Sequence, residues 1–380
     1  MKILTNVQTS HLAGIGQAFW SLLKGLEKNY PKNAEVVGVR VISDKNVSQN
    51  GIFTHKRIKN FKLCSITDQN FPSFKDAVDQ AKNLNDLITS YQPLIEGYQN
   101  LINRQSPDLI LLNGTYYVPW CLYLAARTTK IPIILHYHGI LSKEVSHWSQ
   151  KPRLLMNDLE NSFDNDRIFY LFPSSLARKT VENEVFKHKI SKSAIIPNSV
   201  PDHFFKIKKT GDKENVGFVG RWSKIKNPMF IKKTVEYNNK KHGPYKINLV
   251  TSQTESKKEI KSRKNVVYHP QMNNFLLAGF YEKMGVLLSP SYFETYGNVA
   301  QEAIASGTPA LISENMGVAE TYRKLGLDNF IVDFKSVAKI YKKIGEISGS
   351  EIPQKTRNEL KQIVSDNIIS SEMMNVFNGM

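Results

Sequence analysis

Two glutamates flank a tight turn in the C-terminal half of the chain. The segment SYFETYGNVAQEA, residues 291–303, places Glu294 and Glu302 on either side of a Tyr-Gly-Asn triplet, with seven residues between them. The triplet is typical of a turn, and the small residues after it predict a helix. A helix start attracts phosphate through its N–H groups, whereas carboxylates accept hydrogen bonds from sugar hydroxyls. The spacing suggests a phosphate with a sugar on either side. The alternative is one solvated loop acid and one acid near the helix dipole.

Two cations follow a strand-like segment earlier in the same half. In VGRWSKIKNP, Arg221 follows a glycine and Lys226 comes five residues later, just before Pro228. Proline is favoured in the first turn of a helix, so a helix is predicted to begin there. A guanidinium and an ammonium beside a helix start suit a diphosphate. Two solvated charges in a basic segment are the alternative.

A glycine pair follows the first strand-like segment. In HLAGIGQAF, Gly14 and Gly16 would let the backbone approach a ligand closely, with helix N–H groups directed at an anion. The segment is not a dinucleotide-binding fingerprint, because Phe19 occupies the third glycine position. A tight turn without a ligand is the alternative.

A histidine ends a strand-like segment of the N-terminal half. His138 closes IPIILHYHG, at the end of a strand where sites form in parallel sheets. A metal site with His136 is not supported, because no third ligand is nearby in the sequence. Asp164 and Asp166 form a D-x-D motif that precedes a strand, which favours a turn over a metal site.

Strand and helix patterns alternate along the whole chain, which positions these residues between elements. Strands are predicted near residues 2–7, 35–42, 106–114, 131–139, 167–172, 193–196, 215–220, 246–250, 285–290, 308–313 and 329–334. Helices are predicted near 15–29, 73–104 with a break at Pro93, 121–129, from 228 and from 298. This order predicts an α/β protein with two Rossmann-like domains built on parallel sheets. The proline-punctuated IIPNSVPDHFF separates them. We expect residues 1–198 and 199–355 to form the domains, and residues 356–380 a helix that returns to the first.

The composition is that of a soluble globular protein with an unusual charge. The chain has 380 residues, 41% hydrophobic and 22% charged, and a net charge of +17. The length suits two domains. Two cysteines exclude a disulfide framework, and the apolar runs are too short for a signal peptide or a membrane span, so we expect a cytoplasmic protein. The positive charge suits an anionic membrane surface, an acidic substrate or nucleic acid, or simply a solvated basic face.

Taken together and in this order, the motifs resemble the retaining glycosyltransferases of family 4, which have the GT-B architecture. The resemblance covers nearly the whole chain. Two segments depart from the family pattern, with Asn113 where a histidine is frequent and Ser199 in place of a glycine. The matching segments are GIG, SPDLILLN, IPIILHYHG, IPNSV, VGRWSKIKN, the E-x7-E pair with its ASGTP tail, and GVAE.

The resemblance implies a role for each site residue. Glu302 would hold the nucleotide ribose, Glu294 the hydroxyls of the donor sugar, and His138 would face that sugar. The diphosphate would be held by two cations, by a turn and by the N-terminal glycine loop, that is, by Arg221, Lys226, Thr295, Tyr296, Gly297, Asn298 and Gly16. The N-terminal domain would bind the acceptor and the C-terminal domain the donor.

The resemblance also implies the reaction. A hexose would pass with retention from a UDP-sugar or GDP-sugar to a hydroxyl, without a cofactor or a metal and without an enzymatic nucleophile. The acceptor does not follow from the resemblance; the short apolar run at the N-terminus and the basic surface favour a lipid-linked or cell-surface glycan, as in polysaccharide biosynthesis, with the enzyme peripheral at the inner face of the membrane and without nucleic acid. A soluble glycan, a protein or a small molecule is an alternative acceptor. Alternative functions are a nucleotide-sugar 2-epimerase of the same architecture and a non-catalytic basic binding protein.

Overall fold

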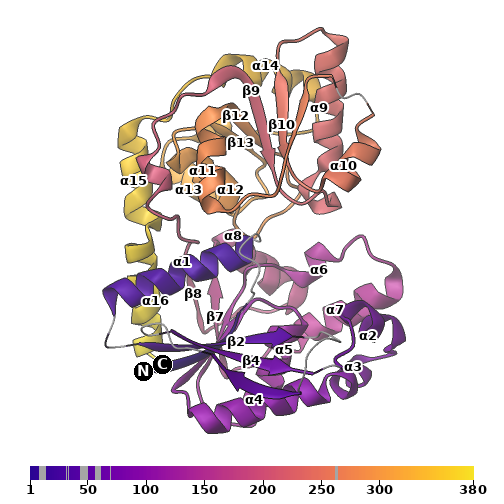
Figure 1. The fold of residues 1–380 in the computed structure, drawn as a ribbon, viewed down its shortest axis with the longest axis vertical. Helices are drawn as coiled ribbons and strands as arrows, with labels where there is room; N and C mark the ends of the chain where they lie inside the picture. The colour runs from indigo at the N-terminus through magenta and orange to yellow at the C-terminus, as the bar shows by residue number, and fades with distance from the viewer. Residues whose placement is uncertain are drawn as a thin grey trace. The chain divides into compact units, whose positions relative to one another are not determined.

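The computed structural model describes residues 1–7, 14–30, 32, 34–42, 50–55, 61–68, 70–261 and 264–380. The chain folds into two compact units, each built on its own sheet (Figure 1). The described residues of the first unit fall within Met1–Ser10, Leu22–Ile196 and Ile369–Met380, and those of the second within His11–Ser21 and Pro197–Ile368.

The first unit contains an eight-stranded sheet in the order β3-β4-β2-β1-β5-β6-β7-β8. All neighbours are parallel except β3 and β4, which are antiparallel. The strands are β1 (Lys2–Asn6), β2 (Glu35–Ile42), β3 (Gly51–Thr54), β4 (Phe61–Thr67), β5 (Leu109–Asn113), β6 (Ile133–His136), β7 (Ile168–Phe172) and β8 (Ser193–Ile195). The helices in this part of the chain are α1 (Gly14–Asn29), α2 (Phe74–Gln80), α3 (Leu84–Ser90), α4 (Gln92–Gln105), α5 (Tyr117–Ala126), α6 (Leu141–Glu144), α7 (Gln150–Asn161), α8 (Ser175–Thr180) and the π-helical turn Val181–Val185.

The second unit contains a five-stranded parallel sheet in the order β11-β10-β9-β12-β13. Its strands are β9 (Asp212–Val219), β10 (Lys246–Val250), β11 (Val266–His269), β12 (Met284–Ser289) and β13 (Ala310–Ile312). Its helices are α9 (Pro228–Lys240), α10 (Gln253–Glu259), α11 (Asn274–Lys283), α12 (Asn298–Ala305), α13 (Ala319–Lys324), α14 (Val337–Ile347) and α15 (Gln354–Val364), with short 3-10 turns at Phe204–Lys206, Lys224–Lys226 and Asp328–Phe330.

Both faces of the second sheet are buried, because alternate residues of a strand point to opposite sides. In β12, Val286 and Leu288 enter a cluster that α9 and α14 complete, whereas Leu287 enters a cluster completed by α11, α12, α13 and α15. Strands covered on both faces are continuous apolar runs, which is why the sequence pattern identified them.

The structure confirms the predicted α/β class and most of the predicted elements, including helix starts at Pro228 and Asn298. The sequence pattern missed β3, β4 and β11. It also predicted a strand at residues 329–334 that does not form, since only an isolated bridge joins Ile331 to Ile312. The apolar side chains of that segment pack against the core without a ladder of hydrogen bonds. The helical stretch predicted at 73–104 with a break at Pro93 is three helices. The interruptions fall at residues 81–83 and 91, whereas Pro93 lies in the first turn of α4.

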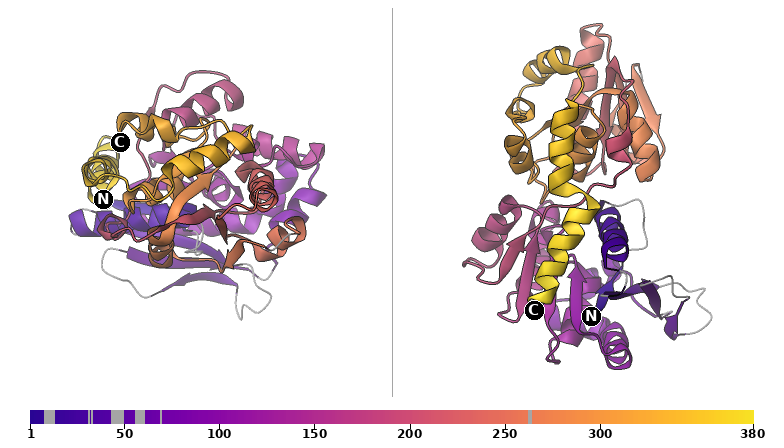
Figure 2. Two further views of the ribbon diagram at one scale, coloured as in Figure 1. Left: turned by 90° about the horizontal axis from the view of Figure 1, so that it is seen from above. Right: turned by 90° about the vertical axis from the view of Figure 1, so that its left-hand side faces the viewer.

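The C-terminal helices belong to different units. Leu360 and Val364 of α15 lie in the core of the second unit. Helix α16 (Asp366–Asn378) lies with the first unit (Figure 2), where Ser370 accepts a hydrogen bond from Asn29 at 2.7 Å. The sequence places the boundaries after residues 198 and 355, and the units divide after Ile196 and Ile368.

Candidate functional site

In the second unit, two adjacent strands are followed by connections that run in opposite directions. β9 and β12 pair in parallel, with Val286 beside Val216 and Leu287 beside Gly217. The chain continues from β9 to β10 and β11 on one side, and from β12 to β13 on the other. Ligands of open parallel sheets bind beyond the carboxyl ends of the strands at such a switch point. The loops after β9 and β12, and the helix α12 that follows the second of them, carry the predicted site residues of this half.

The loop after β9 leads directly into α9. Arg221 is exposed and follows Gly220, whose N–H donates to the carbonyl of Val250 at 3.1 Å. A single 3-10 turn, Lys224–Lys226, follows. Asn227 then adopts a left-handed φ of 52°, which asparagine tolerates better than most residues, before Pro228 opens the helix. Lys226 is thereby held at the start of α9.

The structure joins Lys226 to Glu294 in an ion pair. The distance from Lys226 Nζ to Glu294 Oε2 is 2.8 Å, and the two side chains are 21% and 16% exposed. The other carboxylate oxygen, Oε1, accepts a hydrogen bond from Ser291 Oγ at 2.6 Å. The backbones also meet, because Tyr292 N–H donates to the carbonyl of Ile225 at 2.8 Å. Lys226, predicted to bind the diphosphate, and Glu294, predicted to bind the donor sugar, are therefore in direct contact.

The turn at residues 295–298 presents backbone to the site. Gly297 has a φ of 124°, a conformation that residues with a Cβ rarely adopt, and a Cβ there would lie 2.8 Å from Met316 and 2.9 Å from Val318, so this turn favours glycine. Tyr296 is 2% exposed, and its hydroxyl donates to Gln301 Oε1. Because its ring belongs to the core, a ligand above the turn meets the main chain of Tyr296. Helix α12 begins here, with the positive end of its dipole at this loop.

Glu302 lies in the second turn of α12 and is 5% exposed. Its Oε2 accepts a hydrogen bond from the Tyr281 hydroxyl at 3.0 Å. Burial raises the pKa of Glu302 to about 7, and the bond from Tyr281 opposes that rise. The carboxyl therefore changes charge near neutral pH, and its ionised form gains most from hydroxyl donors supplied by a ligand.

The raised pKa of Glu302 predicts a pH-dependent stability. A carboxyl whose pKa is higher in the folded state favours folding when protonated, and that contribution is lost as pH rises from its ordinary 4.5 through about 7. The unfolding free energy of Glu302→Gln minus that of wild type should therefore increase by ~2–3 kcal/mol from pH 5 to pH 8. Urea unfolding at both pH values measures it.

Glu160 is a second carboxyl whose pKa is raised into the same pH range. It is also buried, and its pKa is raised to about 7, with bonds from the N–H groups of Leu141 and Ser142 at 2.7 and 2.8 Å opposing the rise. The pH dependence of the wild-type unfolding free energy therefore includes contributions from both Glu160 and Glu302. Only the difference between wild type and Glu302→Gln gives the contribution of Glu302. A constant difference at the two pH values would contradict the assignment.

His138 follows the carboxyl end of β6 in the first unit. Its ring and that of His136 are buried, with centroids 3.9 Å apart. Burial lowers the pKa of His136 to about 4, and burial together with the neighbouring His136 lowers the pKa of His138 well below its ordinary value. Both imidazoles are therefore neutral at pH 7. Asn113 pairs with His136 across β5 and β6, and its buried side chain has no hydrogen-bond partner among the described residues.

Gly16 lies in the first turn of α1 and is buried. Residues 8–13, which include part of the predicted glycine loop, lie outside the described residues.

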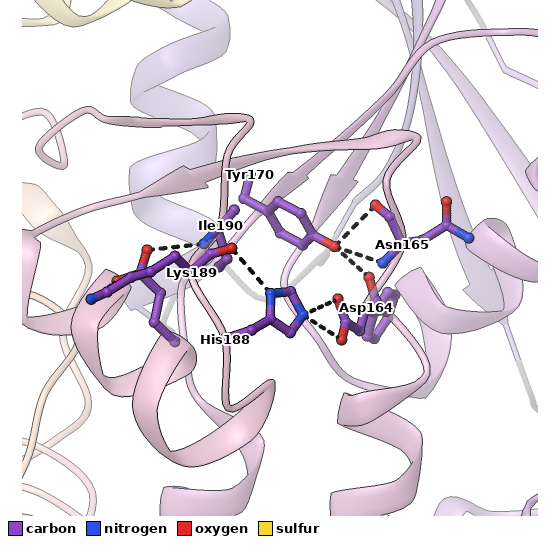
Figure 3. A network of polar contacts seen from close by, with 8 residues as sticks. Asp164, Asn165, Tyr170, His188, Lys189 and Ile190 are labelled. Carbon is purple, nitrogen blue, oxygen red and sulfur yellow. Dashed lines mark hydrogen bonds and ion pairs between the residues drawn. The ribbon is translucent and has the colours of Figure 1, made fainter.

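The D-x-D motif lies at the amino ends of the strands of the first sheet, whereas His138 lies beyond their carboxyl ends. It forms a turn before β7, as predicted, whereas His138 follows β6, and these strands are parallel. Asp164 pairs with His188, at 2.8 Å from Nε2 (Figure 3). The carbonyl of Asp166 accepts a hydrogen bond from Lys192 at 2.7 Å. Within the described parts of the chain, no group of three or more His, Cys, Asp or Glu side chains is arranged to hold a metal ion.

Sequence reasoning missed two residues that set the state of the glutamates. Ser291 lies three residues before Glu294, and this S-x-x-E spacing is a local signal that could have identified it. Tyr281 comes from α11, and nothing in the sequence around Glu302 points to it.

Comparison with known sequences gives a match to the second unit and a match to one relative. Residues 199–364 match the family model described as Glycosyl transferases group 1. The chain is also 25% identical over 166 residues to an uncharacterized 41.2 kDa protein in the cps region of Klebsiella pneumoniae. That match covers 44% of the chain and spans 45% of the relative, less than half its length.

Solved structures resemble the whole chain at low sequence identity. A sucrose-phosphate synthase from Thermosynechococcus elongatus has a TM-score of 0.77 and 16% identity, over 100% of this chain and 99% of that one. A structure of trehalose-6-phosphate from E. coli bound with UDP-2-fluoro glucose has a TM-score of 0.71 and 13% identity, over 100% of this chain and 99% of that one. The lipopolysaccharide outer core galactosyltransferase WaaB has a TM-score of 0.63 and 14% identity over 100% and 99%. These likenesses confirm the predicted GT-B fold.

Proposed function

We propose that this protein is a glycosyltransferase that moves a sugar from a nucleotide-diphosphate sugar to a hydroxyl acceptor. The observation that carries the proposal is the arrangement of Lys226 and Glu294 at the switch point of the second sheet, beside the start of α12. Cation, helix start and carboxylate are the groups that a diphosphate joined to a sugar requires. The match of this unit to a glycosyltransferase model supports the same conclusion.

In this proposal, each group of the second unit binds one part of the donor. Arg221, Lys226 and the backbone at residues 295–298 hold the diphosphate. Glu294 accepts hydrogen bonds from the sugar and Glu302 from the ribose. Gly16 adds backbone to the diphosphate site. The likeness to a structure bound with UDP-2-fluoro glucose supports a UDP-sugar as the first donor to test, with GDP-sugars second.

The proposed reaction proceeds with retention and without a protein nucleophile. The bond from the anomeric carbon to the diphosphate breaks, the acceptor oxygen bonds to the same face of that carbon, and the acceptor proton passes to the leaving phosphate oxygen. The protein contributes positioning and positive charge where the leaving group gains negative charge. Burial keeps His138 neutral, so its imidazole can offer a hydrogen bond without adding charge.

The proposed acceptor is a lipid-linked or cell-surface glycan. The net charge of +17 suits an anionic membrane surface, and the likeness to a lipopolysaccharide galactosyltransferase supports a glycan acceptor. Among the described residues, no helix is long and apolar enough to cross a membrane.

A thermal-shift screen across UDP-sugars and GDP-sugars tests the function. A donor that binds only the folded protein raises its melting temperature, and Glu302→Ala should abolish most of that rise. Transfer to an acceptor glycan would then separate a transferase from a 2-epimerase, which would convert the donor alone. Stabilisation by unrelated DNA and by no nucleotide sugar would instead identify a basic binding protein.

Transfer should not require a divalent metal. Arg221, Lys226 and the start of α12 supply positive charge at the proposed diphosphate site in the second unit. Asp164 belongs to the first unit, where it is paired with His188. We therefore expect full turnover in excess EDTA and in an Asp164→Ala/Asp166→Ala variant. Loss of activity in EDTA that magnesium or manganese restores would overturn the metal-independent mechanism.

A further inference from the structure

The ion pair between Lys226 and Glu294 places a negative charge beside the proposed diphosphate site. Glu294 Oε2 lies 2.8 Å from the Lys226 ammonium. Ser291 holds the other oxygen at 2.6 Å, so the carboxylate is anchored on both sides. A phosphate that approaches Lys226 must share this cation with Glu294 and is repelled by the carboxylate. Glu294 therefore opposes the binding of any anion that offers it no hydrogen-bond donor.

We propose that Glu294 discriminates between the intact nucleotide sugar and the free nucleoside diphosphate, and thereby promotes release of the diphosphate product. This inference rests on the function proposed above. The hydroxyls of a donor sugar give the carboxylate new donors and offset its repulsion, which leaves Lys226 to the diphosphate. Free diphosphate has no such hydroxyls and carries an additional negative charge on its terminal phosphate. After transfer, the carboxylate returns to Lys226 and competes with the product.

The surrounding contacts allow this role to be separated from a structural one. The two loops remain joined without the ion pair, because Tyr292 N–H donates to the Ile225 carbonyl at 2.8 Å. Glutamine in place of Glu294 keeps the side-chain shape and can still accept from Ser291. Glu294→Gln therefore removes the charge while the loop stays in place.

Calorimetry with inorganic pyrophosphate, UDP and GDP tests the inference. At low ionic strength, we expect the affinity of Glu294→Gln for the anion to be about five- to twentyfold higher than the affinity of wild type for the same anion. The difference should shrink in ~1 M salt, where charges are screened beyond ~3 Å. Glu314→Gln is the control, because Glu314 is an acid of the same unit that pairs with Arg323 instead. It should leave affinity unchanged.

A Lys226→Ala background separates the competition for the Lys226 cation from the direct repulsion between Glu294 and the anion. There, Glu294→Gln should strengthen binding less than it does beside an intact Lys226, because the competition for the cation is absent and only the direct repulsion remains. Unchanged or weaker anion binding by Glu294→Gln, or an equal gain in the Lys226→Ala background, would overturn the inference. These outcomes leave the proposed function standing if wild type is stabilised by a nucleotide sugar. Absence of that stabilisation would reject the function itself.

Discussion

Replacing Arg221 or Lys226 with alanine will reduce kcat/KM for sugar transfer by about 30- to 1,000-fold, or ~2–4 kcal/mol of transition-state stabilisation. Arg221 leaves the carboxyl end of β9, and Lys226 precedes α9 beside the α12 loop. Both cations act on charge that develops as the diphosphate departs. The loss should therefore appear in kcat as well as in KM. Steady-state kinetics with the donor found in the screen measures it.

Lys224 provides the matched control for this prediction. It belongs to the same 3-10 turn as Lys226 but is exposed to solvent. Lys224→Ala removes the same charge from the same loop, so it should retain nearly full activity. Wild-type kcat/KM in both Arg221→Ala and Lys226→Ala would reject the diphosphate assignment, as would a loss in Lys224→Ala as large as theirs.

Arg357→Met will destabilise the second unit by ~3–5 kcal/mol. Arg357 of α15 is 2% exposed, and its guanidinium donates to the carbonyls of Ala305, Phe205 and Ile207 at 2.9, 2.9 and 2.8 Å. Methionine fills a similar volume but donates no hydrogen bond, so two buried carbonyls and the partly buried carbonyl of Ile207 lose this donor. Urea unfolding monitored by circular dichroism measures the change.

Lys361→Ala is the comparison for Arg357→Met. Lys361 lies one turn further along α15, is 45% exposed and pairs with Asp202 at 3.4 Å. An exposed pair of this kind contributes ~0–1 kcal/mol. A loss of only ~0–1 kcal/mol in Arg357→Met, as in Lys361→Ala, would show that α15 is held by its apolar face alone. Since Arg357 also binds the last turn of α12, we expect weaker nucleotide binding in the same variant.

The strands that the sequence pattern missed were those without a continuous apolar run. β4 contains Lys62 and Ser65 among its apolar residues, and β11 has four residues that are all partly exposed or exposed. Hydrogen bonds to a neighbouring strand hold both in the sheet, and such partners lie outside any local window. In the segment at residues 329–334 the apolar pattern was present but the ladder was not, because a core position does not by itself require strand pairing.

The sequence by itself determined the two α/β units and the local position of each site residue. Arg221, Lys226, Glu294 and Glu302 take their places from the ends of strands and the starts of helices, which turn residues and apolar runs specify through near neighbours. Only the tertiary structure decided which of these residues meet. The order of strands puts β9 next to β12 and joins Lys226 to Glu294, and the packing of α11 on α12 brings Tyr281 to Glu302. Contacts between residues so far apart depend on sheet order and burial, which no local pattern contains.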